Sequence, residues 1–133
     1  MTSELKPITL WGGVLGPNPS KVGIILTELN VPFVSKYVPF TEVKGLEYVA
    51  VNPNGRLPSI EDPNKGITLW ESGAIIEYLI AEYDHDHKLS FPAGTVENYH
   101  TKQWLYFQVS GQGPYYGQAN VSTLNLSLSG LCS

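Results

Sequence analysis

A helical repeat of apolar residues between two short β-rich runs constrains the fold more than any other feature of the sequence. Four apolar residues recur at i, i+3, i+4 and i+7, namely Val22, Ile25, Leu26 and Leu29. This spacing predicts a helix of about three turns that ends near Asn30. The runs Ile8–Trp11 and Phe33–Phe40 on either side are typical of strands. Two strands joined through a helix pair in parallel, so we predict a β-α-β unit.

Two prolines lie just before the predicted helix. Pro17 and Pro19 belong to the loop Gly16–Ser20. Because proline disfavours helical backbone at the residue before it, we expect the helix to begin only at Ser20 or Lys21.

The next segment predicts a second helix and a hairpin. Lys44–Val51 is expected to form a short helix, closed by the turn signal Asn52-Pro53-Asn54-Gly55. Leu57–Ile60 and Ile67–Trp70 are expected to be strands separated by a turn that contains proline and glycine. Ser72–Tyr83 is then predicted to be helical. The full order is β-α-β-α-β-β-α, an α/β fold with two parallel strands and an antiparallel hairpin.

The boundaries along the chain follow from changes in composition. We expect a first domain over residues 1–84 and a linker over 85–94. Residues 95–120 are expected to hold one helix, which ends at Ser110-Gly111, and the loop after it.

The last stretch, residues 121–133, has no charged side chain. Its leucines alternate with polar residues, which fits a strand, but a lone strand at a chain end has no partner. We therefore expect this tail to be disordered.

Composition and charge exclude several classes of protein. The net charge is −4, and 15% of residues are charged against 42% hydrophobic. The acidic balance argues against a nucleic-acid partner or an anionic membrane surface, and the apolar content is that of a globular chain. No apolar run approaches ~20 residues, and the start lacks the features of a signal peptide. The one cysteine, Cys132, excludes a disulfide framework, so we predict a cytoplasmic location.

The pair Glu71-Ser72 stands between a predicted strand and a predicted helix. Acidic and hydroxyl residues at this position often cap a helix. The same position also suits an amino-acid head group, because free backbone N–H groups and the Ser72 hydroxyl can hold its carboxylate while Glu71 pairs with its ammonium. The sequence favours the cap and leaves the ligand open.

Three further positions carry candidate chemistry. Pro58 either begins a strand or follows a cis peptide bond that turns the backbone of Leu57 toward a ligand. Arg56 is either solvated or holds a carboxylate. Asn18 lies after a central strand, where open α/β sheets bind ligands, and its amide is suited to an anion. Ser20 is expected to cap the helix.

The segment Asp84-His85-Asp86-His87 is rich in residue types that bind metal ions, which suggests a metal site. No cysteine is nearby, and the only other histidine is His100. The spacing fits no closed zinc site, so we expect a solvated linker and no bound metal.

Two motifs together resemble a known family. Asn52-Pro53-Asn54-Gly55-Arg56-Leu57-Pro58 and Glu71-Ser72-Gly73-Ala74-Ile75 resemble the thioredoxin-like N-terminal domain of glutathione transferases. Residues 16–22 and 104–119 resemble the fungal branch, which includes the transferase-like domain of the yeast nitrogen-catabolite regulator. The likeness covers about residues 7–119.

The resemblance implies a role for each candidate residue. Glu71 and Ser72 match the positions that hold the γ-glutamyl ammonium and carboxylate of glutathione. Leu57, before a cis Pro58, matches the backbone partner of the cysteinyl unit. Arg56 matches the position associated with the glycine carboxylate.

Asn18 matches the asparagine near the thiol, where it stabilises the thiolate. The implied reaction is attack of glutathione, as co-substrate, on a small electrophile, with no other cofactor.

The sequence departs from the family at three places. Gly16-Pro17 stands near where related enzymes carry a catalytic serine, and Val43 stands where the branch often has a histidine. Only the first helix of the second, helical domain is present, so the resemblance implies a truncated transferase with a weakened homodimer. The alternatives are a non-catalytic glutathione-binding or regulatory interaction protein, and a fragment that does not fold stably.

Overall fold

The computed structural model describes residues 4–12 and 16–129 of the 133-residue chain. The chain divides into two compact units, Met1–Ser90 and Phe91–Ser133. The division falls inside the predicted linker, residues 85–94.

The first unit contains a four-stranded sheet with the strand order β2-β1-β3-β4. The strands are β1 (Ile8–Gly12), β2 (Phe33–Tyr37), β3 (Ser59–Asp62) and β4 (Ile67–Trp70). Strand β1 pairs in parallel with β2 and antiparallel with β3, which in turn pairs antiparallel with β4. The predicted β-α-β unit and hairpin are therefore confirmed, and so is the thioredoxin-like α/β class.

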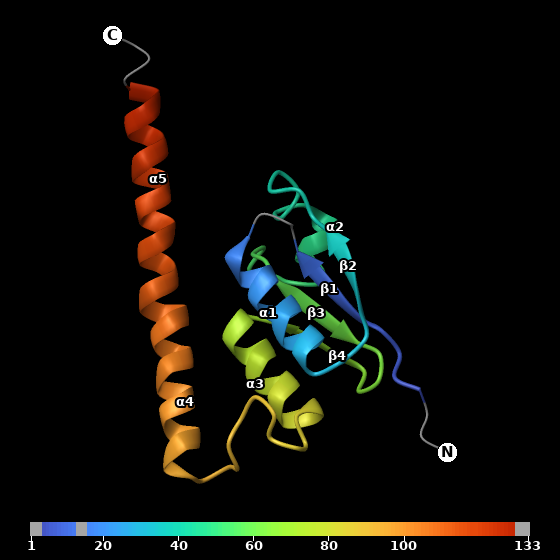
Figure 1. Ribbon diagram of the computed structural model, residues 1–133. Helices are drawn as coiled ribbons and strands as arrows, with labels where there is room; N and C mark the ends of the chain where they lie inside the picture. The colour runs from blue at the N-terminus through green and yellow to red at the C-terminus, as the bar shows by residue number, and fades with distance from the viewer. Residues whose placement is uncertain (1–3, 13–15, 130–133) are drawn as a thin grey trace. The chain divides into compact units, whose positions relative to one another are not determined.

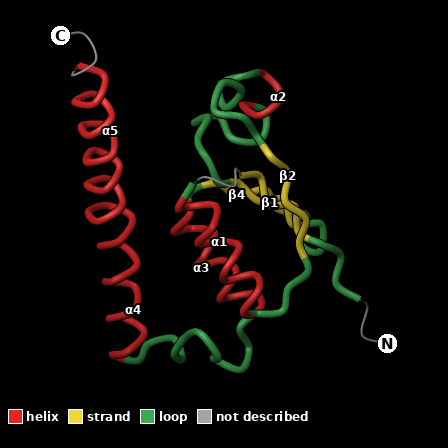
Figure 2. Tube along the Cα trace, turned by 45° about the horizontal axis from the view of Figure 1, so that its top comes forward, coloured by secondary structure: helices red, strands yellow, loops and turns green. Residues whose placement is uncertain are grey.

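Helices cover both faces of this sheet. The helices α1 (Pro17–Glu28) and α3 (Ser72–Tyr83) lie side by side on one face, and α2 (Leu46–Val49) lies on the other (Figures 1 and 2). The main core is buried and apolar, and it includes Ile8, Leu10, Val22, Leu26, Ile60, Ile75 and Leu79. A second cluster of Trp11, Val38 and Tyr48 is buried as well. Side chains alternate between the faces of a strand, so Trp11 faces away from Leu10.

Several element boundaries differ from the sequence prediction: β2 ends at Tyr37 and α2 spans only Leu46–Val49, and two further differences involve proline. Helix α1 begins at Pro17, with proline in its first turn, because proline's fixed φ and missing N–H are tolerated there. Strand β3 begins at Ser59 and not at Leu57. Since β3 pairs on both sides, Pro58 cannot join its ladder.

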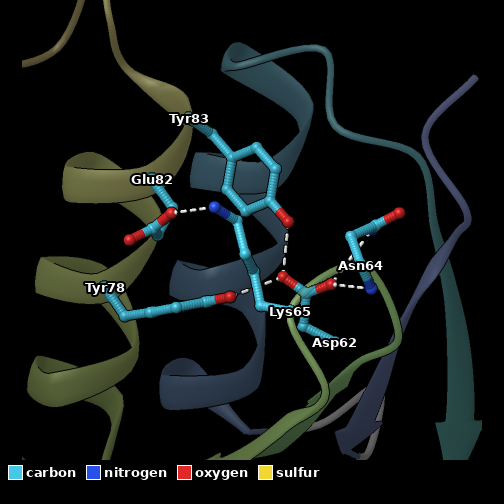
Figure 3. A network of polar contacts seen from close by, with 6 residues as sticks. All are labelled: Asp62, Asn64, Lys65, Tyr78, Glu82 and Tyr83. Atoms are coloured by element: carbon cyan, nitrogen blue, oxygen red, sulfur yellow. Dashed lines mark hydrogen bonds and ion pairs between the residues drawn. The ribbon is translucent and has the colours of Figure 1, made fainter. Parts of the chain in front are cut away.

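A polar network joins the turn of the β3–β4 hairpin to α3 (Figure 3). The Asp62 carboxylate, 1% exposed, accepts hydrogen bonds from Tyr78 Oη at 2.6 Å and Asn64 N at 2.8 Å, and from Tyr83 Oη. Burial by itself raises the pKa of Asp62, but these hydrogen bonds outweigh it and hold the pKa below its ordinary 3.8. Burial and the Asp62 carboxylate raise the pKa of Tyr83 to about 12. The network therefore holds an ionised carboxylate between two protonated tyrosines.

The second unit contains one continuous helical run. Helix α4 (Val96–Phe107) is capped by Thr95, whose Oγ1 accepts the Asn98 N–H at 3.3 Å. A π-helical turn, η1 (Gln108–Gln112), leads directly into α5 (Gly113–Ser129).

The predicted helix end at Ser110-Gly111 is therefore wrong. Proline inside a helix removes a hydrogen bond and crowds the carbonyl four residues earlier. The wider π turn just before Pro114 accommodates that defect. Residues 121–129, expected to be a disordered tail, belong to α5, and residues 130–133 lie outside the described part of the chain.

The second unit buries little by itself. Within α4 no side chain is buried. Its aromatic side chains and those at the start of α5 are exposed, namely Trp104, Tyr106, Phe107, Tyr115 and Tyr116, as the sequence predicts. In the part of the chain that the structure describes, no helix has the length and hydropathy of a bilayer-spanning segment.

Candidate functional site

Strand pairing brings the predicted site segments to one edge of the sheet. Ser59 at the start of β3 pairs with Trp11 at the end of β1 and with Trp70 at the end of β4. The residues next to that pair, Pro58 and Glu71, therefore lie beside each other at the same edge. Ligands of open α/β sheets bind at this edge, beyond the carboxyl end of a parallel strand.

A cleft of about 420 Å³ opens near that edge and is lined by residues 16–19, 40, 43–44 and 55–57. It brings together Asn18, Arg56 and Leu57, three of the sequence-predicted site residues. Glu71 and Ser72 are not part of its lining, but the β3–β4 pairing places Glu71 next to Pro58, and Ser72 follows as the first residue of α3. The Leu57–Pro58 peptide bond is cis, as the resemblance implies.

Two cations and no carboxylate are found among the cleft-lining residues that the structure describes, and the cations are Lys44 and Arg56. Lys44 Nζ donates to the Asn54 carbonyl at 2.6 Å. The exposed Arg56 guanidinium makes no hydrogen bond or ion pair with any described residue. This wall is suited to an anionic group of a ligand.

Sequence reasoning missed Lys44 as a site residue. Lys44 precedes α2, and its Nζ is bonded to Asn54 in the turn that follows α2, where Gly55 permits the close approach of the Lys44 side chain. Gly55 has a φ of +59°, and a Cβ there would lie 2.7 Å from both the Val43 carbonyl oxygen and Lys44 Cδ. The glycine of the turn signal was the only available clue, since it marks a place where backbone and side chain meet closely.

Glu71 occupies an unusual backbone position at the start of α3. Its φ of 73° and ψ of 114° place a non-glycine residue outside the common regions. No side-chain hydrogen bond caps α3, so the favoured capping prediction is wrong. The Glu71 side chain is exposed, whereas Ser72 is 7% exposed. Backbone held in this way is often found where function requires it, and the Glu71 carboxylate remains available to a ligand cation.

Asn18 lies in the first turn of α1. The N-cap is Gly16, and Pro17 and Pro19 have no N–H, so among the first three helical residues only Asn18 offers a backbone donor. The prediction that Ser20 caps the helix is wrong, because its Oγ donates back to the Gly16 carbonyl at 2.9 Å. Asn18 at this helix end is one of the residues that line the cleft.

The chain is similar to proteins of a known family. The family described as "Glutathione S-transferase, N-terminal domain" matches residues 16–82. This chain belongs to that family. A "Glutathione S-transferase-like protein tpcF" from Aspergillus fumigatus is 57% identical over 88% of this chain and 52% of its own length.

Solved structures of glutathione transferases share the fold. The transferase URE2P6 from Phanerochaete chrysosporium, in complex with oxidized glutathione, is 52% identical with a TM-score of 0.82, over 86% of this chain and 54% of that one. Ure2p in complex with glutathione is 34% identical with a TM-score of 0.79, over 87% and 54%. The chain thus spans about half the length of the relatives it matches.

The segment after α3 is held by Asp84. Its carboxylate is buried and accepts the N–H groups of Lys88 at 2.7 Å and Leu89 at 3.0 Å. The prediction of a wholly solvated linker is therefore wrong for Asp84. Across residues 4–12 and 16–129, no three histidine, cysteine or acidic side chains come close enough to hold a metal ion.

Proposed function

We propose that the cleft and the adjoining start of α3 bind glutathione. The observation that carries the proposal is the separation, along one sheet edge, of charges that form no ion pair with any described residue. Glu71 lies at one end, Arg56 and Lys44 lie at the other, and the backbone of Leu57 lies between them. Glutathione has an ammonium and a carboxylate at its γ-glutamyl end, a peptide unit in the middle and a second carboxylate at its glycine end.

Each part of glutathione then has a matching group. Glu71 pairs with the ammonium, and the Ser72 hydroxyl and the N–H groups at the start of α3 hold the γ-glutamyl carboxylate. The Leu57 backbone bonds the cysteinyl unit. Arg56, together with Lys44, holds the glycine carboxylate. The solved relatives named above contain oxidized glutathione or glutathione.

We further propose that Asn18 serves the thiol. An anion near the beginning of α1 interacts favourably with the helix dipole and with the Asn18 N–H, which lowers the pKa of a bound thiol. The thiol releases its proton to water, and the thiolate forms a carbon–sulfur bond to an electrophile as the leaving group departs with its electron pair. Asn18 stabilises the negative charge and transfers no proton.

A non-catalytic, glutathione-binding regulatory role is the second candidate. It is favoured by the similarity to Ure2p and by Gly16-Pro17, which stands near where related enzymes carry a catalytic serine. Formation of a thioether from glutathione and 1-chloro-2,4-dinitrobenzene, followed by absorbance, separates the two candidates. Activity above the uncatalysed rate that falls in Asn18→Ala supports the transferase, and absence of activity with intact binding supports the regulator.

Calorimetric titration with glutathione at millimolar concentration tests the binding site itself. We expect wild-type protein to bind, and Arg56→Ala and Lys44→Ala to bind several-fold more weakly. Lys65→Ala is the matched control, because Lys65 pairs with Glu82 near Asp62 (Figure 3) and is not among the cleft-lining residues. Wild-type protein that is folded but shows no binding at millimolar glutathione overturns the proposal.

γ-Glutamylcysteine, which lacks the glycine, sharpens the assignment. Arg56→Ala weakens the binding of glutathione but leaves that of γ-glutamylcysteine unchanged if Arg56 holds the glycine carboxylate. Equal loss for both ligands contradicts that assignment.

A further inference from the structure

The buried side of the cleft wall holds the Arg56 carbonyl with two donors. Tyr48 Oη donates to it at 2.6 Å and Asn52 Nδ2 at 2.7 Å. We propose that Tyr48 is a positioning residue, whose hydroxyl aims the Leu57 amide at the bound tripeptide by fixing this carbonyl. The inference rests on the proposed function, because it concerns how the same site holds glutathione.

Peptide geometry links the buried carbonyl to the cleft. Leu57–Pro58 is the one cis bond in the described residues, so the Arg56–Leu57 peptide is trans. In a planar trans peptide the C=O and the N–H point in opposite directions. The Arg56 C=O points at Tyr48 and Asn52, and therefore the Leu57 N–H points away from them. Leu57 lines the cleft, and its N–H donates to no backbone carbonyl of the described chain.

The surroundings of Tyr48 fix its hydroxyl firmly. Its side chain is 2% exposed, and its ring lies 5.7 Å from that of Trp11. Leu57 packs against this same cluster. The ring is therefore anchored beneath the residue whose amide it orients.

The proton count shows which of Tyr48's contacts matters for the cleft. A tyrosine hydroxyl has one proton, and Tyr48 gives it to the Arg56 carbonyl. The contact with Ser59 Oγ at 2.8 Å is then a bond from Ser59 to Tyr48. Ser59 is fully buried in β3. Removing the Ser59 hydroxyl thus leaves the bond to Arg56 in place, whereas removing the Tyr48 hydroxyl does not.

The test compares Tyr48→Phe with Ser59→Ala. Each variant removes one buried hydroxyl from the same network, but only Tyr48→Phe releases the Arg56 carbonyl from one donor. We expect Tyr48→Phe to weaken glutathione binding ~3- to 10-fold by calorimetry, and Ser59→Ala to leave it unchanged. Both variants are expected to show similar falls in Tm. A purely structural role predicts equal affinities for the two folded variants and overturns the proposal.

Two ligand comparisons locate the loss. The effect of Tyr48→Phe is expected to be the same with γ-glutamylcysteine, because the Leu57 amide meets the cysteinyl unit that both ligands share. An effect confined to glutathione places the cause at the Arg56 guanidinium and overturns the proposal. Wild-type protein that binds neither ligand overturns the proposed function, and the positioning role with it.

A measurement on the wild-type chain keeps the test valid if Tyr48→Phe does not fold. On titration with glutathione, the amide proton of Leu57 is expected to shift downfield in the NMR spectrum as it forms a hydrogen bond. A Leu57 amide resonance that stays in place while the Arg56 or Glu71 resonances shift overturns the proposal.

Discussion

The two ends of the β3–β4 hairpin use polar residues in opposite ways. At the turn, the Asp62 carboxylate is buried and accepts hydrogen bonds from two tyrosines and Asn64. At the other end, Glu71 and Arg56 are exposed, and neither forms an ion pair within the described chain. Polar groups whose hydrogen bonds are satisfied within the protein stabilise the fold, whereas polar groups without protein partners can bind a ligand. We therefore expect substitutions at the two ends to separate stability from binding.

The largest effect is expected at the turn of the hairpin, where the Asp62 carboxylate is fully hydrogen-bonded. Asp62→Asn removes the charge that receives both tyrosine hydroxyls, and we expect the free energy of unfolding to fall by about 3 kcal/mol. Glutathione affinity of the folded protein is expected to stay the same. Denaturant melts measure the free energy of unfolding, and calorimetric titration with glutathione measures the affinity.

Lys65→Ala is the control for that substitution. It removes the Lys65–Glu82 ion pair of 2.6 Å, which is largely exposed, so we expect only a small loss of stability, far below that of Asp62→Asn. If Lys65→Ala lost as much stability as Asp62→Asn, the buried network would contribute no more than an exposed ion pair, and the expectation would be wrong.

The next largest effect is expected at Glu71. Glu71→Gln keeps the length of the side chain but removes the charge facing the γ-glutamyl ammonium, so we expect glutathione affinity to fall about 30-fold. The melting temperature is expected to change little, because no described residue pairs with Glu71. Glu47→Gln, which breaks an exposed pair with Lys36, is the matched control and should leave affinity intact. A large fall in Tm for Glu71→Gln would contradict the division between the two ends.

A smaller effect is expected at Gly55. Gly55→Ala places a Cβ 2.7 Å from the Val43 carbonyl oxygen at a φ of +59°, so we expect about 1–2 kcal/mol of destabilisation. Because the added atom also meets Lys44, glutathione affinity should fall as well. Gly66→Ala is the control: Gly66 has a similar φ of +65° but open space around it, and it should cost less stability and no affinity.

The smallest effect is expected from pH. The pKa of Asp62 is lowered by folding, so its contribution to stability is present above the ordinary value of 3.8 and is lost as the pH falls through the folded value. The pKa of Tyr83 is raised to about 12, so its contribution is present below 10 and is lost as the pH rises toward 12. Melts across this range should show both losses in wild-type protein, and Asp62→Asn should flatten the acid one.

Local patterns predicted much of the fold and the candidate residues. The apolar spacing around Leu26 and the turn after Asn52 act over a few residues, and both elements form as expected. The placement of Asn18 and Leu57 on one cleft also follows from strand order, because the ends of β1 and β4 meet the start of β3.

Two of the incorrect predictions share a physical cause. The start of α1 at Pro17 and the passage of the helical run through Pro114 both depend on where the missing N–H falls within a turn. The presence of a proline in the sequence does not by itself show where in a helical turn its missing N–H will fall. Likewise, Asp84 in a charged stretch has the signature of solvent exposure, and only its bonds to Lys88 and Leu89 show that it is buried.

The order of strands and helices in the first unit, the hairpin and the family motifs could be predicted from the sequence, because each arises from neighbours in the chain. The tertiary structure alone decided that Lys44 reaches the cleft, that Tyr48 holds the Arg56 carbonyl and that Asp62 binds residues 16 and 21 positions away. Those contacts form only after separate elements have packed together. A hydrogen bond between distant residues has no local signature, because its geometry is set by the packing of everything between them.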